Sequence, residues 1–176
     1  MLPSDLAGAC RPVKLLLFDC DGVLTGGQIV LGNGDLDLKL FSTRDGLGIG
    51  LWHRAGYACG VVTARWSEAL ARRAQELKFE EVHQSTSNKR ETVRAIRERR
   101  GLRREEVAYV GDDLNDLCVK HEVGLFFAPA DAHPAVASRA DHHLRTPGGQ
   151  GAVREAIDLI LTAQHRYDDL IATYLD

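Results

Sequence analysis

Short apolar segments that alternate with helical patterns constrain the fold of this chain more than any other feature. Most of the apolar segments are continuous rather than alternating, which predicts strands covered on both faces; the third is the weakest. The expected strands are Val13–Phe18, Tyr57–Val62, Glu81–Gln84, Val107–Val110 and Gly124–Phe127.

Helical periodicity fills the intervals between these strands. The expected helices are Gly46–Arg54, Ser67–Lys78, Lys89–Arg100, Leu114–Lys120 and Pro134–Arg139, and helical periodicity also runs through Gly151–Leu175. Strands that alternate with helices favour an α/β fold, in which a parallel sheet carries helices on both faces.

Residues 28–41 depart from this alternation. Their sequence, QIVLGNGDLDLKLF, places alternating apolar residues on each side of Gly32–Asp35, which predicts a β-hairpin. The hairpin follows the loop after the first strand, so we interpret it as a small insertion in a single domain, residues 1–176. Its apolar residues exceed what one small sheet can bury, and such strips usually mark an interface. They are Ile29, Leu31, Leu36, Leu38 and Leu40.

Charge and hydropathy exclude several classes of protein. The net charge of −3 over 176 residues argues against broad electrostatic affinity for nucleic acid or an anionic membrane. No apolar run is long enough to predict a membrane-spanning helix, and the first residues lack the pattern of a secretory signal. The cysteines form no C-x-x-C pair, which favours free thiols. We therefore expect a cytoplasmic protein that binds phosphate only at a local site.

Carboxylates gather after two of the predicted strands. Asp19 and Asp21 follow the first strand, where open α/β sheets bind ligands. Asp112, Asp113 and Asp116 follow the strand that ends at residue 110. An aspartate can simply cap a turn or a helix, but like charges at these spacings repel. A divalent cation would resolve the repulsion, and few carboxylates with open positions suit Mg²⁺.

Two further polar residues lie at strand and helix ends. Thr63 ends the second strand, where its hydroxyl and amide could hold a phosphoryl oxygen. Lys89 opens a helix, against the helix dipole, which indicates that it faces negative charge elsewhere. Each residue alone has an ordinary structural interpretation.

In chain order, D-x-D-G-V-L-T, a strand-end threonine, a lysine and G-D-D-x-x-D resemble the haloacid dehalogenase superfamily of phosphotransferases. Asp19 matches the nucleophile of the first motif, and Asp21 matches its general acid/base. The matches to the second, third and fourth motifs are Thr63, Lys89 and the pair Asp112 and Asp113.

Further segments look like the small capless branch of that superfamily. They are Arg44–Gly46, Ser87–Lys89, Gly111–Asp113, Ala130–Pro134 and Gly148–Glu155. The resemblance implies a Rossmann-like sheet with no separate cap domain. It also implies a homotetramer, in which the hairpins associate around the assembly axis and a neighbouring subunit helps to cover each active site.

The resemblance further implies an Mg²⁺-dependent phosphatase that forms an aspartyl-phosphate. The expected substrate is 3-deoxy-D-manno-octulosonate 8-phosphate, and the alternative is a nine-carbon acid 9-phosphate of the KDN or N-acetylneuraminate type. Asp19, the backbone carbonyl of Asp21 and Asp112 are expected to hold the metal. Asp113 is expected to orient Lys89 or metal-bound water, and Asp116 could act in the same way.

Substrate contacts are predicted from residue type. Arg44 and Arg65 are candidates for the substrate carboxylate because arginine binds it bidentately, and exposed surface arginines are the alternative. Gly148 and Gly149 are candidates for a backbone loop at the mouth of the active site. A flexible connection before a helix explains these two glycines equally well.

Two rival functions come from other classes. A receiver domain also combines an acidic cluster, threonine, lysine and Mg²⁺. In a receiver, however, both acidic positions precede the threonine and lysine, and no residue corresponds to Asp21. A non-catalytic phosphosugar-binding relative would be indicated by loss of Asp19 or Asp21, and both are present.

Overall fold

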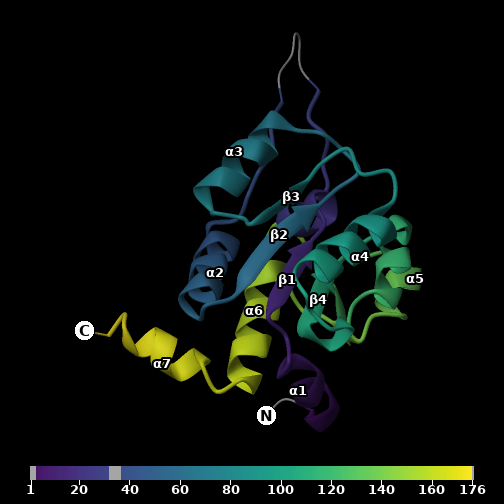
Figure 1. The fold of residues 1–176 in the computed structure, drawn as a ribbon. Helices are drawn as coiled ribbons and strands as arrows, with labels where there is room; N and C mark the ends of the chain where they lie inside the picture. Colours follow the sequence, from purple (N-terminus) through teal and green to yellow (C-terminus); the bar gives the residue numbers. More distant parts are fainter. Residues whose placement is uncertain (1–2, 32–36, 176) are drawn as a thin grey trace.

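A computed structural model describes residues 3–31 and 37–175. Its strands form one parallel sheet in the order β3-β2-β1-β4-β5-β6 (Figure 1). The strands are β1 (Leu15–Phe18), β2 (Ala58–Val62), β3 (Glu81–His83), β4 (Val107–Val110), β5 (Leu125–Ala128) and β6 (His142–His143). The predicted parallel α/β sheet is therefore confirmed.

The four central strands, β1, β2, β4 and β5, consist of apolar residues because their side chains are buried on both faces of the sheet. Along β1, Leu16 and Phe18 join one apolar cluster, whereas Leu15 and Leu17 join a second cluster. Successive side chains of a strand point to opposite faces, so the two clusters are the two cores of a covered sheet.

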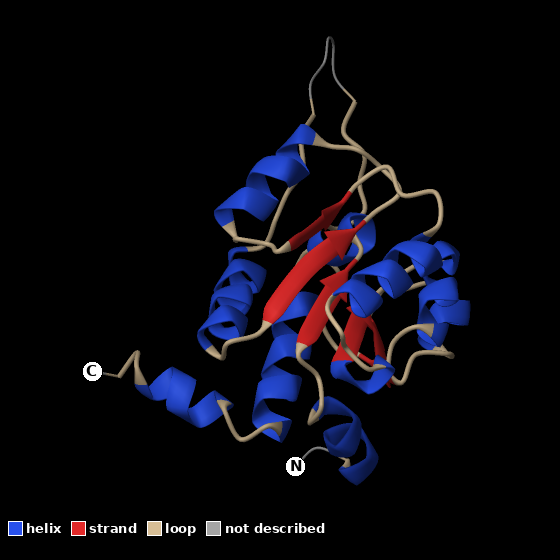
Figure 2. Ribbon diagram, in the orientation of Figure 1, coloured by secondary structure: helices blue, strands red, loops and turns tan. Residues whose placement is uncertain are grey.

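Helices cover both faces, as predicted (Figure 2). One layer packs on the first cluster and contains α1 (Ser4–Cys10), α2 (Thr43–Arg54), α3 (Glu68–Glu76) and α6 (Ala152–Ala163). The other contains α4 (Lys89–Arg99), the 3₁₀ helix η3 (Leu114–His121) and α5 (Pro134–Ala137). The remaining elements are the turn η1 (Cys20–Leu24), the 3₁₀ turn η2 (Arg104–Glu106) and the C-terminal α7 (Tyr167–Ala172).

Local capping explains where the helices near the cleft begin. Ser42, Ser67 and Asn88 immediately precede α2, α3 and α4, and each side chain accepts a hydrogen bond from a backbone N–H of the first turn. Such caps satisfy donors that the helix itself cannot pair. The cap at Asn88 thereby places Lys89 on the first turn of α4.

Several elements differ from the sequence-based expectation. Residues 114–121 form a 3₁₀ helix rather than an α-helix, and at its start the side chain of Asp116 turns back to accept backbone N–H groups. The stretch 151–175 divides into α6 and α7 at His165, which has a positive φ of 55°. Helix α1 and the two-residue strand β6 were not predicted, since both are too short to show periodicity.

The predicted hairpin is only partly described. Residues 28–31 and 37–41 form no strand, and they extend beyond the carboxyl edge of the sheet (Figure 1). Four of the five apolar residues expected on the strip are exposed, namely Ile29, Leu31, Leu38 and Leu40. Leu36 and the rest of the predicted turn, residues 32–36, lie outside the described part of the chain.

The described residues include no separate cap domain beside the sheet. Nor does any helix within residues 3–31 and 37–175 combine the length and hydropathy needed to span a bilayer.

Candidate active site

The candidate site lies at the carboxyl edge of the sheet, around β1. Strand β1 pairs with β2 on one side and with β4 on the other. Asp19 follows β1, Thr63 follows β2, and Asp112 lies two residues beyond β4. Because parallel strands end at the same edge, these three residues line one cleft of about 450 Å³.

A buried lysine joins two of the predicted aspartates. Lys89 Nζ lies 2.6 Å from Asp19 Oδ2 and 2.7 Å from Asp116 Oδ1. All three residues are nearly inaccessible to solvent. Burial by itself lowers the pKa of Lys89, but the facing Asp116 and Asp19 outweigh it and raise the pKa above its ordinary value. Burial, followed by the charge of Asp116, raises the pKa of Asp19.

Asp116 is a structural hub because donors converge on it from two sides. Its Oδ1 accepts hydrogen bonds from Lys89 and from Tyr109 Oη, the latter at 2.9 Å. Its Oδ2 accepts from the backbone N–H groups of Asp112 at 3.1 Å and Asp113 at 3.4 Å. The carboxylate therefore fixes both the lysine and the backbone of the acidic loop.

Asp112 is packed against the loop that carries Asp21. A Cβ atom added to Gly22, whose φ is +86°, would lie 2.0 Å from Asp112 Oδ2, so no side chain fits there. Asp112 Oδ1 is buried and has no hydrogen-bond partner among the described residues. Burial, and then the charges of Asp116 and Asp19, raise the pKa of Asp112 to about 8.

Asp21 lies at the mouth of the cleft between two cations. Lys39 Nζ donates a hydrogen bond to Asp21 Oδ1, and Arg65 Nε lies 3.6 Å from Asp21 Oδ2. Asp21 and Arg65 line the same cleft as Asp19 and Thr63. The structure thus brings one of the two predicted arginines to the site.

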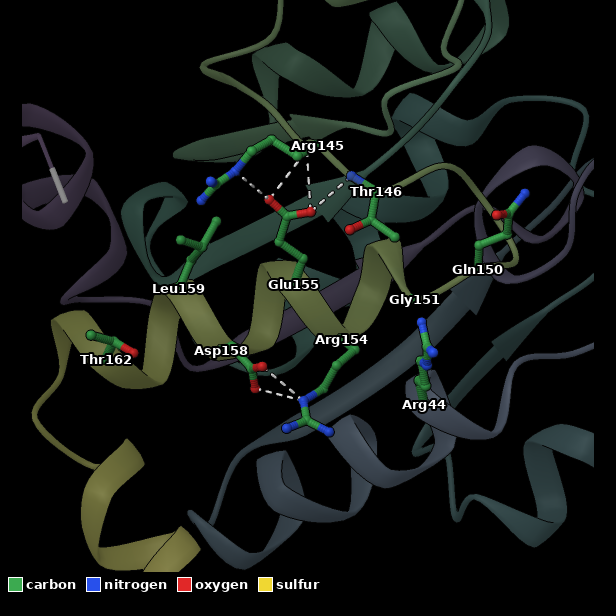
Figure 3. A pocket seen from close by; sticks show the side chains of 10 residues that line it. All are labelled: Arg44, Arg145, Thr146, Gln150, Gly151, Arg154, Glu155, Asp158, Leu159 and Thr162. Atoms are coloured by element: carbon green, nitrogen blue, oxygen red, sulfur yellow. Dashed lines mark hydrogen bonds and ion pairs between the residues drawn. The ribbon is translucent and has the colours of Figure 1, made fainter. Parts of the chain in front are cut away.

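Arg44 lies elsewhere, contrary to the expectation that it accompanies Arg65 in the cleft. It lines a separate cavity of about 370 Å³ beside α6, together with Arg145 and Arg154 (Figure 3). The cause is its place on the first turn of α2, which packs against α6.

Gly148 and Gly149 also do not line the carboxylate cleft. A Cβ atom on Gly148 would lie 1.8 Å from the carbonyl oxygen of Gly22, and Gly149 N–H donates to the carbonyl of Val23 at 2.9 Å. The two glycines therefore pack directly against the backbone of the Asp21 loop. Only residues without side chains allow the two backbones to approach so closely.

Of the two residues expected to orient Lys89, the structure pairs it with Asp116 and not with Asp113. Asp113 is the N-cap of η3, and its Oδ1 accepts from Leu114 N–H at 2.7 Å. The three-residue turn of the 3₁₀ helix instead returns Asp116 to the interior, where it meets Lys89.

Sequence reasoning missed two residues that contact the site. Tyr109 was interpreted only as part of an apolar strand, although a buried tyrosine hydroxyl needs a polar partner. Lys39 was interpreted only as part of the predicted hairpin. The signal available for Lys39 was a charged side chain between Leu38 and Leu40, in a segment adjacent to the first motif.

The residues present fit a divalent cation. Carboxylate oxygens of Asp19, Asp112 and Asp116 lie within 4.8 Å of one another, and Asp112 Oδ1 is the unpaired one. Lys89 supplies the only ammonium group that the described structure shows in contact with these three carboxyl groups. When all three are ionised, negative charge exceeds positive charge, which a bound cation would offset, and hard oxygen ligands suit Mg²⁺.

A second group of metal-ligand side chains has different surroundings. His53, Cys59 and Glu80 cluster near the amino end of β2. Both ring nitrogens of His53 lie within 3.2 Å of backbone carbonyl oxygens, and Glu80 Oε2 accepts from Cys59 N–H at 3.0 Å. These contacts pair the His53 nitrogens and Glu80 Oε2 within the fold, so we interpret this cluster as structural.

Comparison with known proteins agrees with this geometry. Residues 63–157 match the family described as haloacid dehalogenase-like hydrolase. The 3-deoxy-D-manno-octulosonate 8-phosphate phosphatase of Escherichia coli strain K12 is 40% identical over 166 residues, which cover 94% of this chain and 88% of that protein.

Two solved structures are similar over nearly their whole length. The phosphatase of the same name from Yersinia pestis has a TM-score of 0.93 and 37% identity, covering 95% of this chain and 90% of that one. The Moraxella catarrhalis phosphatase, in complex with magnesium ion, phosphate ion and a KDO molecule, has a TM-score of 0.95 and 31% identity, covering 98% and 99%.

The family match includes Thr63, Lys89 and Asp112. The similarity to the phosphatases also covers β1 and the two aspartates that follow it, Asp19 and Asp21. By sequence, by fold and by the arrangement of its strand-end carboxylates, the chain belongs to the haloacid dehalogenase-like hydrolase family.

Proposed function

We propose that this protein is an Mg²⁺-dependent phosphatase that hydrolyses 3-deoxy-D-manno-octulosonate 8-phosphate to KDO and phosphate. The observation that carries the proposal is the cleft in which Asp19, held by Lys89, lies beside the unpaired Asp112 oxygen. The relative that was solved with magnesium, phosphate and KDO supports the metal and the substrate.

Asp19 acts as the nucleophile. Its carboxylate attacks phosphorus, the bond from phosphorus to the sugar oxygen breaks, and Asp21 donates a proton to that oxygen as it leaves. Water then attacks the aspartyl-phosphate, Asp21 takes the proton from the water, and Asp19 is released with inorganic phosphate. Asp21 suits both steps because it lies two residues from Asp19 at the mouth of the same cleft.

Lys89 and Thr63 hold the transferring phosphoryl group. The Lys89 ammonium already faces Asp19, so an oxygen of the phosphate can share it, and Thr63 lines the same cleft as Asp19 and Asp112. Asp19, the Asp21 carbonyl and Asp112 would hold Mg²⁺. When bound, Mg²⁺ supplies positive charge between the nucleophile and the anionic ester.

Arg65 is the residue we assign to the carboxylate of the sugar acid. Its guanidinium is more than half exposed at the mouth of the cleft and lies beside Asp21, where the leaving sugar must be. A planar guanidinium can bind a carboxylate bidentately. Arg44 receives no such role in the cleft of its own subunit.

The assembly we propose is a homotetramer formed through the segment 28–41, with the chain as a single phosphatase domain. Exposed Ile29, Leu31 and Leu40 support an interface there, because such an apolar strip is unusual on a monomer. Free Cys10, Cys20, Cys59 and Cys118 support a reducing, cytoplasmic location.

A phosphate-release assay across a panel of phosphate esters tests the function. The panel contains the eight-carbon 8-phosphate, nine-carbon 9-phosphates and simple sugar phosphates, with and without Mg²⁺. We expect the highest kcat/KM for the eight-carbon ester and no turnover by Asp19→Asn, with exposed Asp169→Asn as the matched control. Preference for a nine-carbon ester would replace the proposed substrate, and phosphorylation without release of phosphate would favour a receiver.

A further inference from the structure

Lys39 reaches the proposed general acid/base from outside the cleft. Its ammonium group donates to Asp21 Oδ1, and its side chain is only 10% exposed. Residue 39 belongs to no helix or strand. The position of this lysine therefore depends on contacts made by its neighbours, not on backbone hydrogen bonds of a regular element.

Asp37 supplies such a contact, two residues before Lys39. Asp37 Oδ2 accepts hydrogen bonds from Ser67 Oγ at 2.7 Å and from Ala69 N–H at 3.0 Å. Ser67 is also the N-cap of α3 and accepts from Leu70 N–H. The segment 37–39 is thus tied to α3 at one end and to Asp21 at the other.

Lys39 and Asp21 line two different cavities, which share Arg65. Lys39 lines a neighbouring cavity with Trp66 and Leu38, whereas Asp21 lines the cleft with Asp19. Lys39 donates a hydrogen bond to Oδ1 of Asp21, whereas Oδ2 forms a longer ion pair with Arg65 Nε at 3.6 Å. Oδ1 is therefore the oxygen that the protein holds by a hydrogen bond, and Oδ2 is the one left to face the leaving sugar.

We propose that Lys39 is a positioning residue for Asp21: it holds Oδ1 and so presents Oδ2 to the leaving oxygen and then to the attacking water. The anchor of Asp37 on α3 keeps Lys39 in place. This inference rests on the proposed phosphatase function. Its physical basis is that proton transfer requires the carboxyl group within hydrogen-bond reach of the reacting oxygen, and small misplacements are costly.

Two esters with different leaving groups test the role of Lys39. A sugar alkoxide needs protonation as it leaves, whereas nitrophenolate leaves without it. For Lys39→Met we expect kcat on the sugar-acid phosphate to fall about a hundredfold, with the nitrophenolate burst from p-nitrophenyl phosphate changed by less than about threefold. The later steady state on that ester should slow, because Asp21 also activates water.

Three further variants separate positioning from other roles. Lys39→Arg keeps the charge and should restore most of the lost kcat. Asp37→Ala keeps the lysine side chain but removes the anchor of its segment on α3, and it should cause a smaller loss, about tenfold, with the same dependence on leaving group. Lys120→Met removes an ion-paired lysine remote from the cleft and should leave the activity on both esters unchanged.

Some outcomes overturn the inference. Equal losses on both esters in the first step, which releases the alcohol or the nitrophenolate, a raised KM with unchanged kcat, or failure of arginine to rescue would each show that Lys39 does not position Asp21. Thermal unfolding of each variant excludes a general loss of folding, and Lys39→Gln repeats the test with a different neutral side chain.

The proposed function fails in a distinguishable way. If the wild-type protein cleaves another alkyl phosphate instead of the eight-carbon ester, the substrate is wrong, and the comparison is made on that alkyl ester. A wild-type protein that cleaves no phosphate ester overturns the function and this inference with it.

Discussion

Asp116 Oδ1 lies 2.7 Å from Lys89 Nζ, and this contact connects the acidic loop after β4 to the first turn of α4 across 27 residues of sequence. The pair matters because Lys89 also touches Asp19, the proposed nucleophile. Asp116 therefore acts on the chemistry through Lys89, and the same carboxylate holds the loop that carries Asp112.

Replacing Asp116 by asparagine should disturb this connection without removing volume. Four donors converge on the carboxylate, and an amide NH₂ group cannot accept from any of them. In the presence of Mg²⁺ we expect Asp116→Asn to lose about 3 kcal/mol of unfolding free energy, as for a broken buried ion pair, and to lower kcat. Urea unfolding measures the loss of unfolding free energy, and a phosphate-release assay measures kcat.

The matched control for stability is Asp113→Asn. Asp113 caps η3, and asparagine is an equally good cap, so the unfolding free energy should change by about 0.5 kcal/mol or less. Equal losses for the two variants would contradict the central role of Asp116.

Replacing Asp112 by asparagine should weaken Mg²⁺ binding and the stability that Mg²⁺ confers. A ligand that binds only the folded state raises the melting temperature, and this rise should be large for the wild type and small for Asp112→Asn. Without Mg²⁺ the variant should be no less stable, because Asp112 Oδ1 has no hydrogen-bond partner to lose among the described residues, and burial already raises the pKa of Asp112 to about 8. Melting curves with Mg²⁺ and after chelation decide this, and an identical shift in both proteins would exclude Asp112 as a ligand.

Gly148→Ala should distort the loop of Asp21. The new Cβ atom would lie 1.8 Å from the Gly22 carbonyl oxygen, so the backbone must move. We expect a loss of about 3 kcal/mol in stability and a fall in kcat from misplacement of Asp21. Gly50→Ala, in helix α2 with open space around it, should instead stabilise the protein by about 1 kcal/mol. A Gly148→Ala enzyme with wild-type kcat would contradict the close packing.

Charges on the exposed apolar strip should dissociate the proposed tetramer. Leu31 and Leu40 are the most exposed apolar residues of segment 28–31 and 37–41, so the pair Leu31→Glu and Leu40→Glu should give smaller species in sedimentation velocity, with lower activity. Leu47→Glu, on the exposed side of α2, is the control. An active wild-type monomer at micromolar concentration would rule out the tetramer as the functional form.

Glu106 should make stability depend on acid pH. Hydrogen bonds from Lys14 and from the Arg103 backbone N–H lower the pKa of Glu106 to about 2, below its ordinary value of 4.5. Its contribution is therefore present above pH 4.5 and is lost as the pH falls toward 2. Glu106→Gln should be less stable than the wild type at pH 7, and the difference should shrink in urea unfolding at acid pH. A difference independent of pH would refute this linkage.

Sequence reasoning succeeded where the information is local. Continuous apolar runs predicted β1, β2 and β4, and the residues directly after the first two of these strands, Asp19 and Thr63, lie in the cleft. It was less successful for residues 28–41, where alternating apolar residues predicted strands that the described residues do not form. Alternation of apolar and polar residues indicates that a segment is compatible with a strand. It does not show that a partner strand is present, which a stable sheet requires.

The sequence alone determined the parallel α/β class, the strand-end positions of the aspartates proposed as catalytic and the family resemblance, because each depends on residues close together in the chain. Only the tertiary structure decided that Lys89 pairs with Asp116, that Lys39 holds Asp21, and that Arg65 rather than Arg44 lines the cleft. These pairings join residues 27 and 18 positions apart. The packing of helices and loops against the sheet determines which distant side chains meet. Local periodicity does not predict that packing, because it reflects only residues close together in the chain.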